Sequence, residues 1–432
     1  MGPPADGGAP AWFSATVGSA HRRGTATDAD LFSGAAWEAL LERLRQVGGV
    51  LQSERAPHTP AEQAAGYRHL LVLLALAIDE ALRPSDSTDP YFAPANVDNV
   101  LKWGMDCPDA AYTGSALMPG ATYRIRGRRG TVRYLGFQVM SGIESSANVV
   151  ADDLDIDPDG GFELVLSPDE QPGNWMPTFD RASSLVVRQF FYDWNAEVPA
   201  HLDIECVGPG RHSPGRHNPG RHSPGRESPG RSDPAPESPA GVARQLVAIG
   251  EFVEASIDFW LQIEDSGRAQ GINVFRQPAA LTQMGAAAEN VSVWGSWELP
   301  PERALVIEVA PPKALYWSVA LGNHWWETID YADHQSSLNG HQAVVDGDGV
   351  FRAVVAHRDP GVANWLDTGG NAQGPMIFRW LRADDAPVPA TRVVDFDDID
   401  AALPPETVRV DAEERRAVLA MRRAGVRRRF RR

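Results

Sequence analysis

The chain contains few cysteines and no apolar run long enough to span a membrane. Only two cysteines, Cys107 and Cys206, occur in 432 residues, too few for a disulfide framework and too far apart for a CxxC redox or zinc pair. The longest uninterrupted apolar run, Leu70 to Ile78, is much shorter than the ~18 to 20 residues of a membrane span. The N-terminus lacks the basic and apolar regions of a signal peptide. We therefore expect a soluble, cytoplasmic protein without a membrane partner.

Positive charge is also scarce. Lys102 and Lys313 are the only lysines, and the net charge is −17. Nucleic-acid binding requires a basic face that neutralises phosphates, so we expect no nucleic-acid partner. The arginine cluster between Arg422 and Arg432 could hold a phosphate or the acidic surface of a partner. We favour a solvated helix end, where cations complement the helix dipole.

The familiar catalytic signatures are absent. The sequence contains no GxSxG elbow, no GxxxxGK loop, no GxGxxG after a strand and no HExxH. These absences argue against the standard hydrolase, kinase, Rossmann and zinc-protease classes. The cofactor and the oligomeric state stay unknown at this level.

Helical patterns open the chain and recur after its middle. Apolar residues at i, i+3 and i+4 spacing predict a helix over 35–47. Thr59, with Pro60 and Glu62 after it, caps a second helix, and we expect the pair to form a hairpin that covers a sheet. Further patterns predict a helix over 242–263 and a C-terminal helix capped by Asp411.

Between the helices, short segments rich in β-branched and aromatic residues alternate with Pro and Gly clusters, which is typical of sandwiches and jelly rolls. The segment 208–240 instead contains Gly-Arg-His-Ser-Pro repeats that are too poor in apolar residues to form a core. We predict a mainly β fold with accessory helices, built from tandem antiparallel β-sandwich or jelly-roll-like units. Residues 1–100 form a tail and the helical hairpin, 101–207 the first unit and 208–240 the linker. Residues 241–403 form a helix and the second unit, and 404–432 a basic helix.

Two segments share one pattern, which predicts an internal duplication. The first contains Asp157-Pro-Asp-Gly, Asn174-Trp175 and Arg188, and the second contains Asp346-Gly-Asp-Gly, Asn364-Trp365 and Arg379. From Asp to Trp the separation is 175 − 157 = 18 against 365 − 346 = 19, and from Trp to Arg it is 13 against 14. Asp-Gly tolerates the positive φ of a hairpin turn. The Asn is expected to bond the loop backbone, the Trp to offer a flat surface and the Arg to project from a strand.

Metal binding is a possible role for several of these residues, but a structural role explains them better. Aspartates alternate from Asp153 to Asp159 as at the start of an EF-hand loop, yet the closing position holds Leu166 where a bidentate Glu is required. We therefore favour a turn. Three histidines of the linker could bind a metal, but a solvated repeat is favoured; they are His212, His217 and His222. We assign no metal site.

The motifs resemble those of a bacterial family, many of whose members are actinobacterial, known as domain of unknown function 1214. The resemblance covers about 103–403 apart from the linker. It rests on the motif at Trp103 to Tyr112, Gly173-Asn174-Trp175, Arg188-Gln-Phe-Phe and the motif at Asp359 to Leu366. It implies a β-sandwich architecture with a helical part and no settled activity. Cys107 stands where the motif is expected to hold Asn, which leaves the role of this position open.

Two polar clusters are candidate sites. The first contains Asp106, Asp109 and Tyr112 in a Pro-containing loop, where they could act as acid, base or hydroxyl ligands or could cap the loop. The second contains His324-Trp325-Trp326-Glu327, Asp330, His334 and His341. Its Trp rings could stack a sugar ring or a flat ligand, and its His and Asp are titratable or metal-binding groups. Buried core Trp and solvated His are the alternatives, and a Glu327–Asp330 pair or a three-histidine metal site is less favoured.

Three functions remain open. The first is an enzyme that acts on a small polar or glycosidic molecule on an aromatic-lined face, with His324, Asp330 or His334 as acid or base. The second is a non-catalytic binding protein for a carbohydrate or another small ligand. Its binding residues would be Asp106, Asp109, Tyr112, Trp175, Arg188, Trp325, Trp326, Asn364, Trp365 and Arg379, with the two arginines holding an anionic group. The third is a structural protein whose arginine tail docks a partner.

Overall fold

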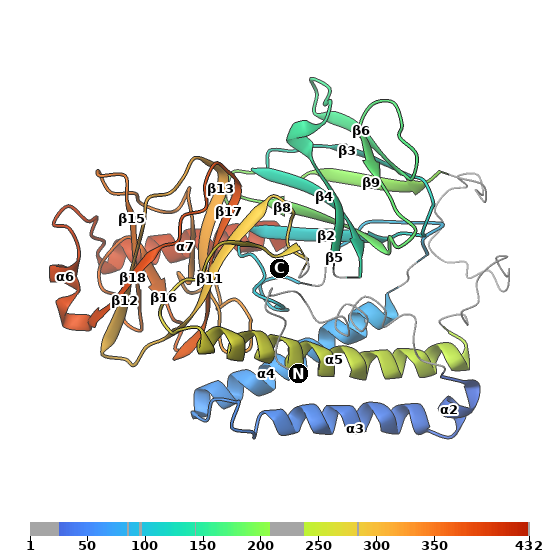
Figure 1. Ribbon diagram of the computed structural model, residues 1–432, viewed down its shortest axis with the longest axis horizontal. Coiled ribbons are helices and arrows are strands. Elements are labelled where there is room, and N and C mark those ends of the chain that lie inside the picture. The colour runs from blue at the N-terminus through green and yellow to red at the C-terminus, as the bar shows by residue number, and fades with distance from the viewer. Residues whose placement is uncertain are drawn as a thin grey trace.

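The fold comes from a computed structural model that describes residues 26–83, 86–94, 97–142, 144–207, 237–282 and 285–430. Most of the predicted linker, including its three histidines, lies outside the described residues. Two β units stand side by side above a layer of helices (Figure 1). The prediction of a mainly β fold with N-terminal and C-terminal helices is confirmed.

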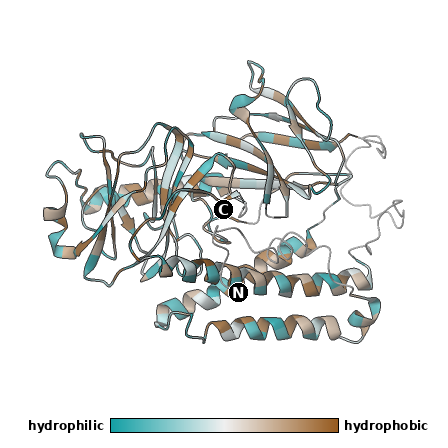
Figure 2. Cartoon of the chain, in the orientation of Figure 1, coloured by the Kyte–Doolittle hydropathy of each residue, from teal (hydrophilic) through white to brown (hydrophobic). Residues whose placement is uncertain are grey.

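The helical layer combines α2 (Asp28–Phe32), α3 (Ala35–Val50) and α4 (Pro60–Leu82) with the long α5 (Pro239–Ala269). The Thr59 hydroxyl oxygen accepts the backbone N–H of Glu62 at 3.3 Å, which confirms the predicted cap. The apolar faces of α3 and α4 bury side chains against α5, and apolar and polar stretches alternate along these helices (Figure 2). The expectation that the hairpin covers a sheet was wrong, because the apolar side chains of α3 and α4 share their core with α5 and with no described strand.

The first unit packs two sheets on one core. The sheet that faces the second unit, here the first inner sheet, has the order β1-β2-β8-β4-β5, and the outer sheet has the order β7-β6-β3-β9. Phe137 of the inner sheet and Leu164 of the outer sheet are fully buried in the shared core. The strands are β1 (Ala93–Pro94), β2 (Ala110–Ala116), β3 (Tyr123–Arg128), β4 (Tyr134–Ser141), β5 (Glu144–Val150), β6 (Gly161–Ser167), β7 (Trp175–Pro177), β8 (Ser184–Phe190) and β9 (His201–Cys206), with a 3₁₀ turn at Ala151–Asp153.

The second unit repeats this order of strands. Its inner sheet is β10-β11-β17-β13-β14 and its outer sheet is β16-β15-β12-β18, with a core that includes Val319 and Val355. The strands are β10 (Ala279–Ala280), β11 (Asn290–Glu298), β12 (Arg303–Val309), β13 (Ala314–Leu321), β14 (Ser337–Asn339), β15 (Phe351–Ala356), β16 (Trp365–Asp367), β17 (Gln373–Ala383) and β18 (Ala390–Asp395). A 3₁₀ turn (Phe396–Asp398) and the short α6 (Ile399–Ala402) follow β18.

The Asn-Trp pairs occupy corresponding places in the two units. The Asn174 amide donates to the backbone oxygens of Asp155 and Glu163, both at 2.9 Å. The Asn364 amide donates in the same way to Val344 and Arg352. Each Asn therefore holds a loop against a strand, as expected. The strand after each Asn, β7 or β16, pairs in parallel with β6 or β15.

The Asp-Gly segments form turns, as the sequence predicts. The N–H of Gly160 donates to the oxygen of Asp157 at 2.8 Å, and the N–H of Gly349 donates to that of Asp346 at 2.9 Å. Both glycines have φ above +80°, where a side chain would be strained. Within the described part of the chain, no three His, Cys, Asp or Glu side chains are grouped so that they could hold a metal.

The C-terminal helix α7 (Ala412–Phe430) packs into the protein. The Asp411 carboxylate accepts the N–H of Glu414 at 2.9 Å, which confirms the predicted cap. The expectation of a solvated arginine cluster was wrong for Arg422, which is 4% exposed. It was also wrong for the Arg429 guanidinium, whose nitrogens are buried beside the Trp194 ring at 4.3 Å. The helix brings its cations to aromatic and carbonyl groups at the contact of the two units.

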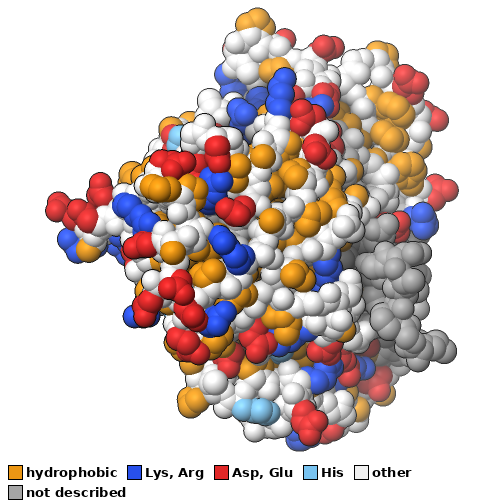
Figure 3. All heavy atoms as spheres, turned by 60° about the vertical axis from the view of Figure 1, so that its left-hand side comes forward, with side chains coloured by type: hydrophobic (Ala, Val, Ile, Leu, Met, Phe, Trp, Pro, Cys, Tyr) orange, Lys and Arg blue, Asp and Glu red, His pale blue; other side chains and the backbone are white. Residues whose placement is uncertain are grey.

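The surface mixes charges of both signs. Arginine and acidic side chains are interspersed with apolar ones over the face seen in Figure 3. None of the described helices combines the length and apolar composition that a membrane-spanning segment requires.

Candidate functional site

The two inner sheets face each other across a layer of polar side chains. Arg188 lies on β8, the central strand of one inner sheet, and Arg379 lies at the corresponding position of β17. Their sequence neighbours Val187 and Phe378 are fully buried in the cores of the two units. Because side chains alternate along a strand, both guanidiniums point out of their own unit and into the contact between the units.

Each arginine holds the backbone of the segment that leads into the other unit. The Arg379 guanidinium donates to the carbonyl oxygen of Met105, five residues before β2 begins at Ala110. The Arg188 guanidinium donates to the carbonyl oxygen of Gly285, five residues before β11 begins at Asn290. The two contacts are therefore reciprocal.

One terminal nitrogen of each arginine stays unpaired. Nη1 of Arg188 and Nη1 of Arg379 are buried and have no hydrogen-bond partner among the described residues. The Tyr112 ring centre lies 5.9 Å from Cζ of Arg188, and its hydroxyl oxygen accepts the N–H of Cys107 at 3.2 Å. Burial raises the pKa of Tyr112, and both arginines only partly oppose that rise. The phenol therefore stays protonated and can donate a hydrogen bond.

Asp109 is the centre of a buried hydrogen-bond network. It is 1% exposed, and one carboxylate oxygen accepts from Nε1 of Trp194 and from the Asn339 amide, both at 2.7 Å. The other oxygen accepts the Tyr316 hydroxyl at 2.6 Å. That hydroxyl also lies 3.3 Å from Sγ of Cys107. Because the donors come from both units, Asp109 joins them.

Asp106 lies beside Arg379 in a second buried set. Burial raises the pKa of Asp106 to about 6, although Lys102, Thr328 and Arg379 favour its carboxylate form. The Thr328 hydroxyl donates to Oδ1 of Asp106 at 3.0 Å, and Nζ of Lys102 donates to the Thr328 carbonyl at 2.7 Å. Burial also lowers the pKa of Lys102. Asp106 can therefore exchange a proton close to neutral pH.

The structure thus brings the first predicted cluster together with both predicted arginines. Asp106, Asp109 and Tyr112 lie in one polar layer with Arg188 and Arg379. The signal in the sequence was the repeated strand arginine combined with a polar loop before β2.

The residues of the second predicted cluster do not converge. Burial lowers the pKa of His324 to about 4, and its ring meets Trp325 edge-on at 5.0 Å. Nδ1 of His334 lies 2.7 Å from the Asp367 carboxylate. Asp330 is exposed, and its carboxylate accepts the N–H of Ala332 at 2.8 Å in a local turn. Asp330 lies close enough to His334 to help raise its pKa, whereas the groups that shift the pKa of His324 include neither of them.

The other titratable residues of that cluster are also separate. Oε1 of Glu327 lies 2.9 Å from Nδ1 of His69, within hydrogen-bond distance. Burial alone would raise the pKa of Glu327, but His69, Asn323 and Lys102 together lower it. His341 lies 3.7 Å from Asp193 near the surface. The structure does not bring His324, His334 and His341 together.

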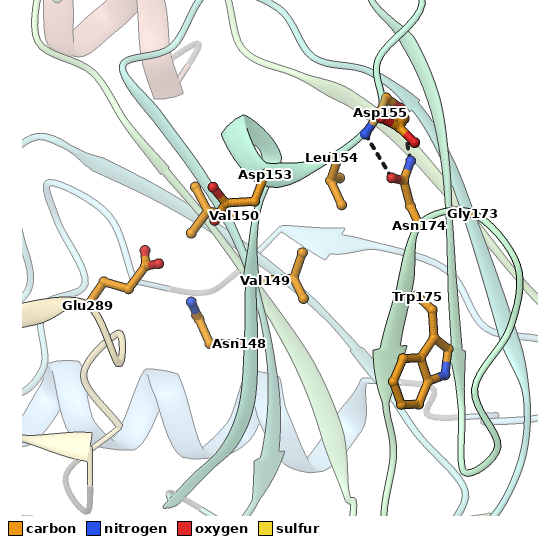
Figure 4. A pocket seen from close by; sticks show the side chains of 10 residues that line it. All are labelled: Asn148, Val149, Val150, Asp153, Leu154, Asp155, Gly173, Asn174, Trp175 and Glu289. Atoms are coloured by element: carbon orange, nitrogen blue, oxygen red, sulfur yellow. Dashed lines mark hydrogen bonds between the residues drawn. The ribbon is translucent and has the colours of Figure 1, made fainter.

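Three of the predicted stacking rings are buried in packed regions. Trp325, Trp326 and Trp365 are 2%, 3% and 8% exposed. Trp326 stacks on Trp260 at 4.9 Å, so these rings do not form the open aromatic face that we expected. The neighbouring Asn364 amide is bonded to backbone oxygens. Trp175 is different, because it lines a pocket of about 350 Å³ (Figure 4).

Sequence reasoning missed several members of the polar layer. Tyr316, Asn339 and Arg422 come from parts of the chain more than 200 residues from Asp109, and no local pattern connects them. Lys102 could have been suspected, because it is one of only two lysines and directly precedes the Trp103-Gly104 motif.

Comparisons with known proteins identify the family. A family described as "Protein of unknown function (DUF1214)" matches residues 303–385. An uncharacterized protein from Burkholderia cenocepacia has a similar crystal structure, with 32% identity and a TM-score of 0.74 over 87% of this chain and 100% of that chain. This chain belongs to the DUF1214 family.

Other comparisons add no argument about function. The VPA0106 protein from Vibrio parahaemolyticus is 13% identical with a TM-score of 0.42, over 76% of this chain and 99% of that one. A salicylate 1,2-dioxygenase from Pseudoaminobacter salicylatoxidans is 12% identical with a TM-score of 0.15, over 77% of this chain and 81% of that one. No curated protein matches this DUF1214 chain.

Proposed function

We propose that this protein binds a small anionic molecule in the polar layer between the two inner sheets, with Arg188 and Arg379 as the groups that hold it. One observation carries the proposal: two guanidiniums at corresponding positions each keep a buried nitrogen without a partner among the described residues. A buried unpaired donor costs about 1–3 kcal/mol. A carboxylate or phosphate would remove that cost, since its oxygens match the guanidinium fork.

Charge supports an anion rather than a neutral ligand. Burial lowers the pKa of Arg188, and the groups that favour its charged form are the phenols of Tyr112 and Tyr134 rather than a carboxylate. Arg379 has Asp106 among its neighbours, and that acid, with a pKa of about 6, is mostly a carboxylate at pH 7. Tyr112, which stays protonated, adds a neutral donor. Asp106 is therefore the one carboxylate among the described groups that favour the charge of the two guanidiniums.

Acid–base catalysis on the bound anion is the second candidate. A general acid or base works best when its pKa is near the working pH, and Asp106 meets this condition beside Arg379. We therefore move the proposed acid–base role from His324, Asp330 and His334 to Asp106. A glycosidic substrate stacked on Trp rings is less favoured, because Trp325 is buried.

We further propose that the two units descend from one duplicated unit, and that the protein is cytoplasmic. The equal strand orders and the equivalent roles of Asn174 and Asn364 support the duplication. The two free cysteines suit a reducing compartment.

Calorimetric titration with malonate and succinate tests the binding proposal, with neutral malonamide as the matched ligand control. We expect one of the dianions to bind and malonamide to show at least tenfold weaker binding. Arg379→Gln should weaken binding at least tenfold, whereas Arg45→Gln should not change it, because Arg45 is 69% exposed. Equal affinity of the Arg379 and Arg45 variants would contradict the proposal.

The same preparation separates binding from catalysis. If a bound dianion is consumed, Asp106→Asn should abolish turnover and leave its affinity within about threefold. Turnover that survives this substitution would exclude Asp106 as the acid or base.

A further inference from the structure

A pocket on the first unit lies next to, but outside, the arginine layer. It has a volume of about 350 Å³ and lies between the end of β5, the 3₁₀ turn after it and the segment that leads into β7. Figure 4 shows Asn148, Asp153 and Glu289 on one side of the pocket, and Leu154, Trp175, Asn174 and Asp155 on the other. The pocket therefore has a mainly polar and acidic lining, with an apolar surface at Leu154 and Trp175.

The acidic side is incompletely paired. Asp153 accepts from the Arg382 guanidinium at 2.8 Å, and Oε1 of Glu289 lies 3.8 Å from the same group. Oε2 of Glu289 is buried and has no hydrogen-bond partner among the described residues. Asp155 also lines the pocket. Asp153 and Glu289 thus share the Arg382 guanidinium.

The second unit shows what fills the corresponding place there. Asn148 on β5 pairs with Gln138 of β4, and Ser337 on β14 pairs with Ala320 of β13, so Asn148 and Ser337 correspond. The Arg422 guanidinium of α7 donates to the carbonyl oxygen of Ser337 at 3.0 Å and to its hydroxyl at 2.9 Å. An arginine side chain therefore occupies the second unit at the position of the pocket.

The acid and the aromatic ring correspond as well. Asp109 directly precedes β2 and Glu289 directly precedes β11, and Asp109 is the main group that favours the charged form of Arg422. On the same helix, the Arg415 guanidinium lies 5.2 Å from the centre of the Trp365 ring. Trp365 corresponds to Trp175 of the pocket. None of the described residues that line the pocket of the first unit belongs to an α-helix.

We propose that this pocket binds a small organic cation with a guanidinium head and a short aliphatic body. The head would donate to Oε2 of Glu289 and to the Asn148 side-chain oxygen. In the second unit, Arg422 donates to the corresponding Ser337, and Asp109, which corresponds to Glu289, favours its charged form. The aliphatic body would lie against Leu154 and the Trp175 ring, a contact that suits both an apolar chain and a cation. This site is separate from the proposed anion site and does not depend on it.

Calorimetric titration of the full chain with propylguanidinium tests the proposal, with neutral propylurea of nearly the same shape as the ligand control. We expect propylguanidinium to bind at least tenfold more tightly than propylurea. Glu289→Gln should remove most of this preference, because it keeps the shape of the side chain and removes its charge. Asp203→Asn is the matched control, since Asp203 is 83% exposed on β9, and its affinity should equal that of the wild type.

A second variant, at a more exposed side chain, tests the same pocket in case Glu289→Gln impairs folding. Asp153→Asn removes a charge at the pocket from a side chain that is 53% exposed, and it should weaken propylguanidinium binding about threefold. Equal binding of propylguanidinium and propylurea by the wild type would overturn the proposal. Unchanged affinity in both the Glu289 and the Asp153 variants would overturn it too, whether or not dianions bind to the arginine layer.

Discussion

Replacement of Asp109 by Ala should be among the most damaging single substitutions in this protein. The carboxylate is 1% exposed and accepts hydrogen bonds from Trp194, Asn339 and Tyr316 at 2.6 to 2.7 Å. Each buried donor left without an acceptor costs about 1–3 kcal/mol. Arg422 would also lose its main favourable charge. Because contributions that share partners do not simply add, we expect a loss of about 4 to 6 kcal/mol.

Thermal unfolding followed by calorimetry measures this loss. One kcal/mol shifts Tm by roughly 2–4 °C in a domain of ~150–250 residues, so the Asp109→Ala variant should unfold about 8 to 24 °C lower. Asp203→Ala removes an equal charge from an exposed site and should change stability by no more than about 0.5 kcal/mol. A Tm for Asp109→Ala within about 2 °C of the Asp203→Ala value would refute the view that Asp109 joins the two units.

Three further predictions concern pH and backbone. The hydrogen bond to the Asp367 carboxylate raises the pKa of His334. The stability that this bond contributes is therefore present below pH ~6.5 and is lost as the pH rises through the folded-state pKa. In urea unfolding, His334→Gln should destabilise the protein more at pH 5.5 than at pH 8.5. Burial lowers the pKa of His324 to about 4, so stability should fall as pH drops from about 6.5 towards 4, and His324→Phe should flatten that part of the pH profile. Gly425→Ala should lower Tm, because the added Cβ would lie 2.6 Å from Cβ of Trp194. At Gly48 on α3 an added Cβ meets nothing within 4 Å, so Gly48→Ala should stabilise the protein by about 0.5–1 kcal/mol.

The sequence predicted the elements better than their contacts. Caps at Thr59 and Asp411 and the Asp-Gly turns are local, because each depends on residues three or four positions apart. The repeated Asn-Trp and strand Arg were also visible, since two copies of a pattern in one chain are a strong signal. The place of the helical hairpin was not visible, because its apolar faces match α5 as well as they match a sheet.

The candidate site was predictable only in part. Tyr112 and Arg379 could be selected from motifs, but their proximity depends on how two units that are far apart in the sequence pack together. The cluster around His324 was selected because its aromatic and titratable residues are adjacent in sequence. Adjacent residues in an irregular segment point in different directions, and the core takes up Trp325 and Trp326. The burial of Arg422 was missed because a basic helix end is usually solvated.

A crystal structure of the protein soaked with succinate, in a carboxylate-free buffer, tests the central claim most directly. The account predicts a bound dianion between the inner sheets, with a carboxylate oxygen within hydrogen-bond distance of Nη1 of Arg379 or Arg188. Ordered water alone at both nitrogens, or succinate only at a place away from this layer, would contradict the claim.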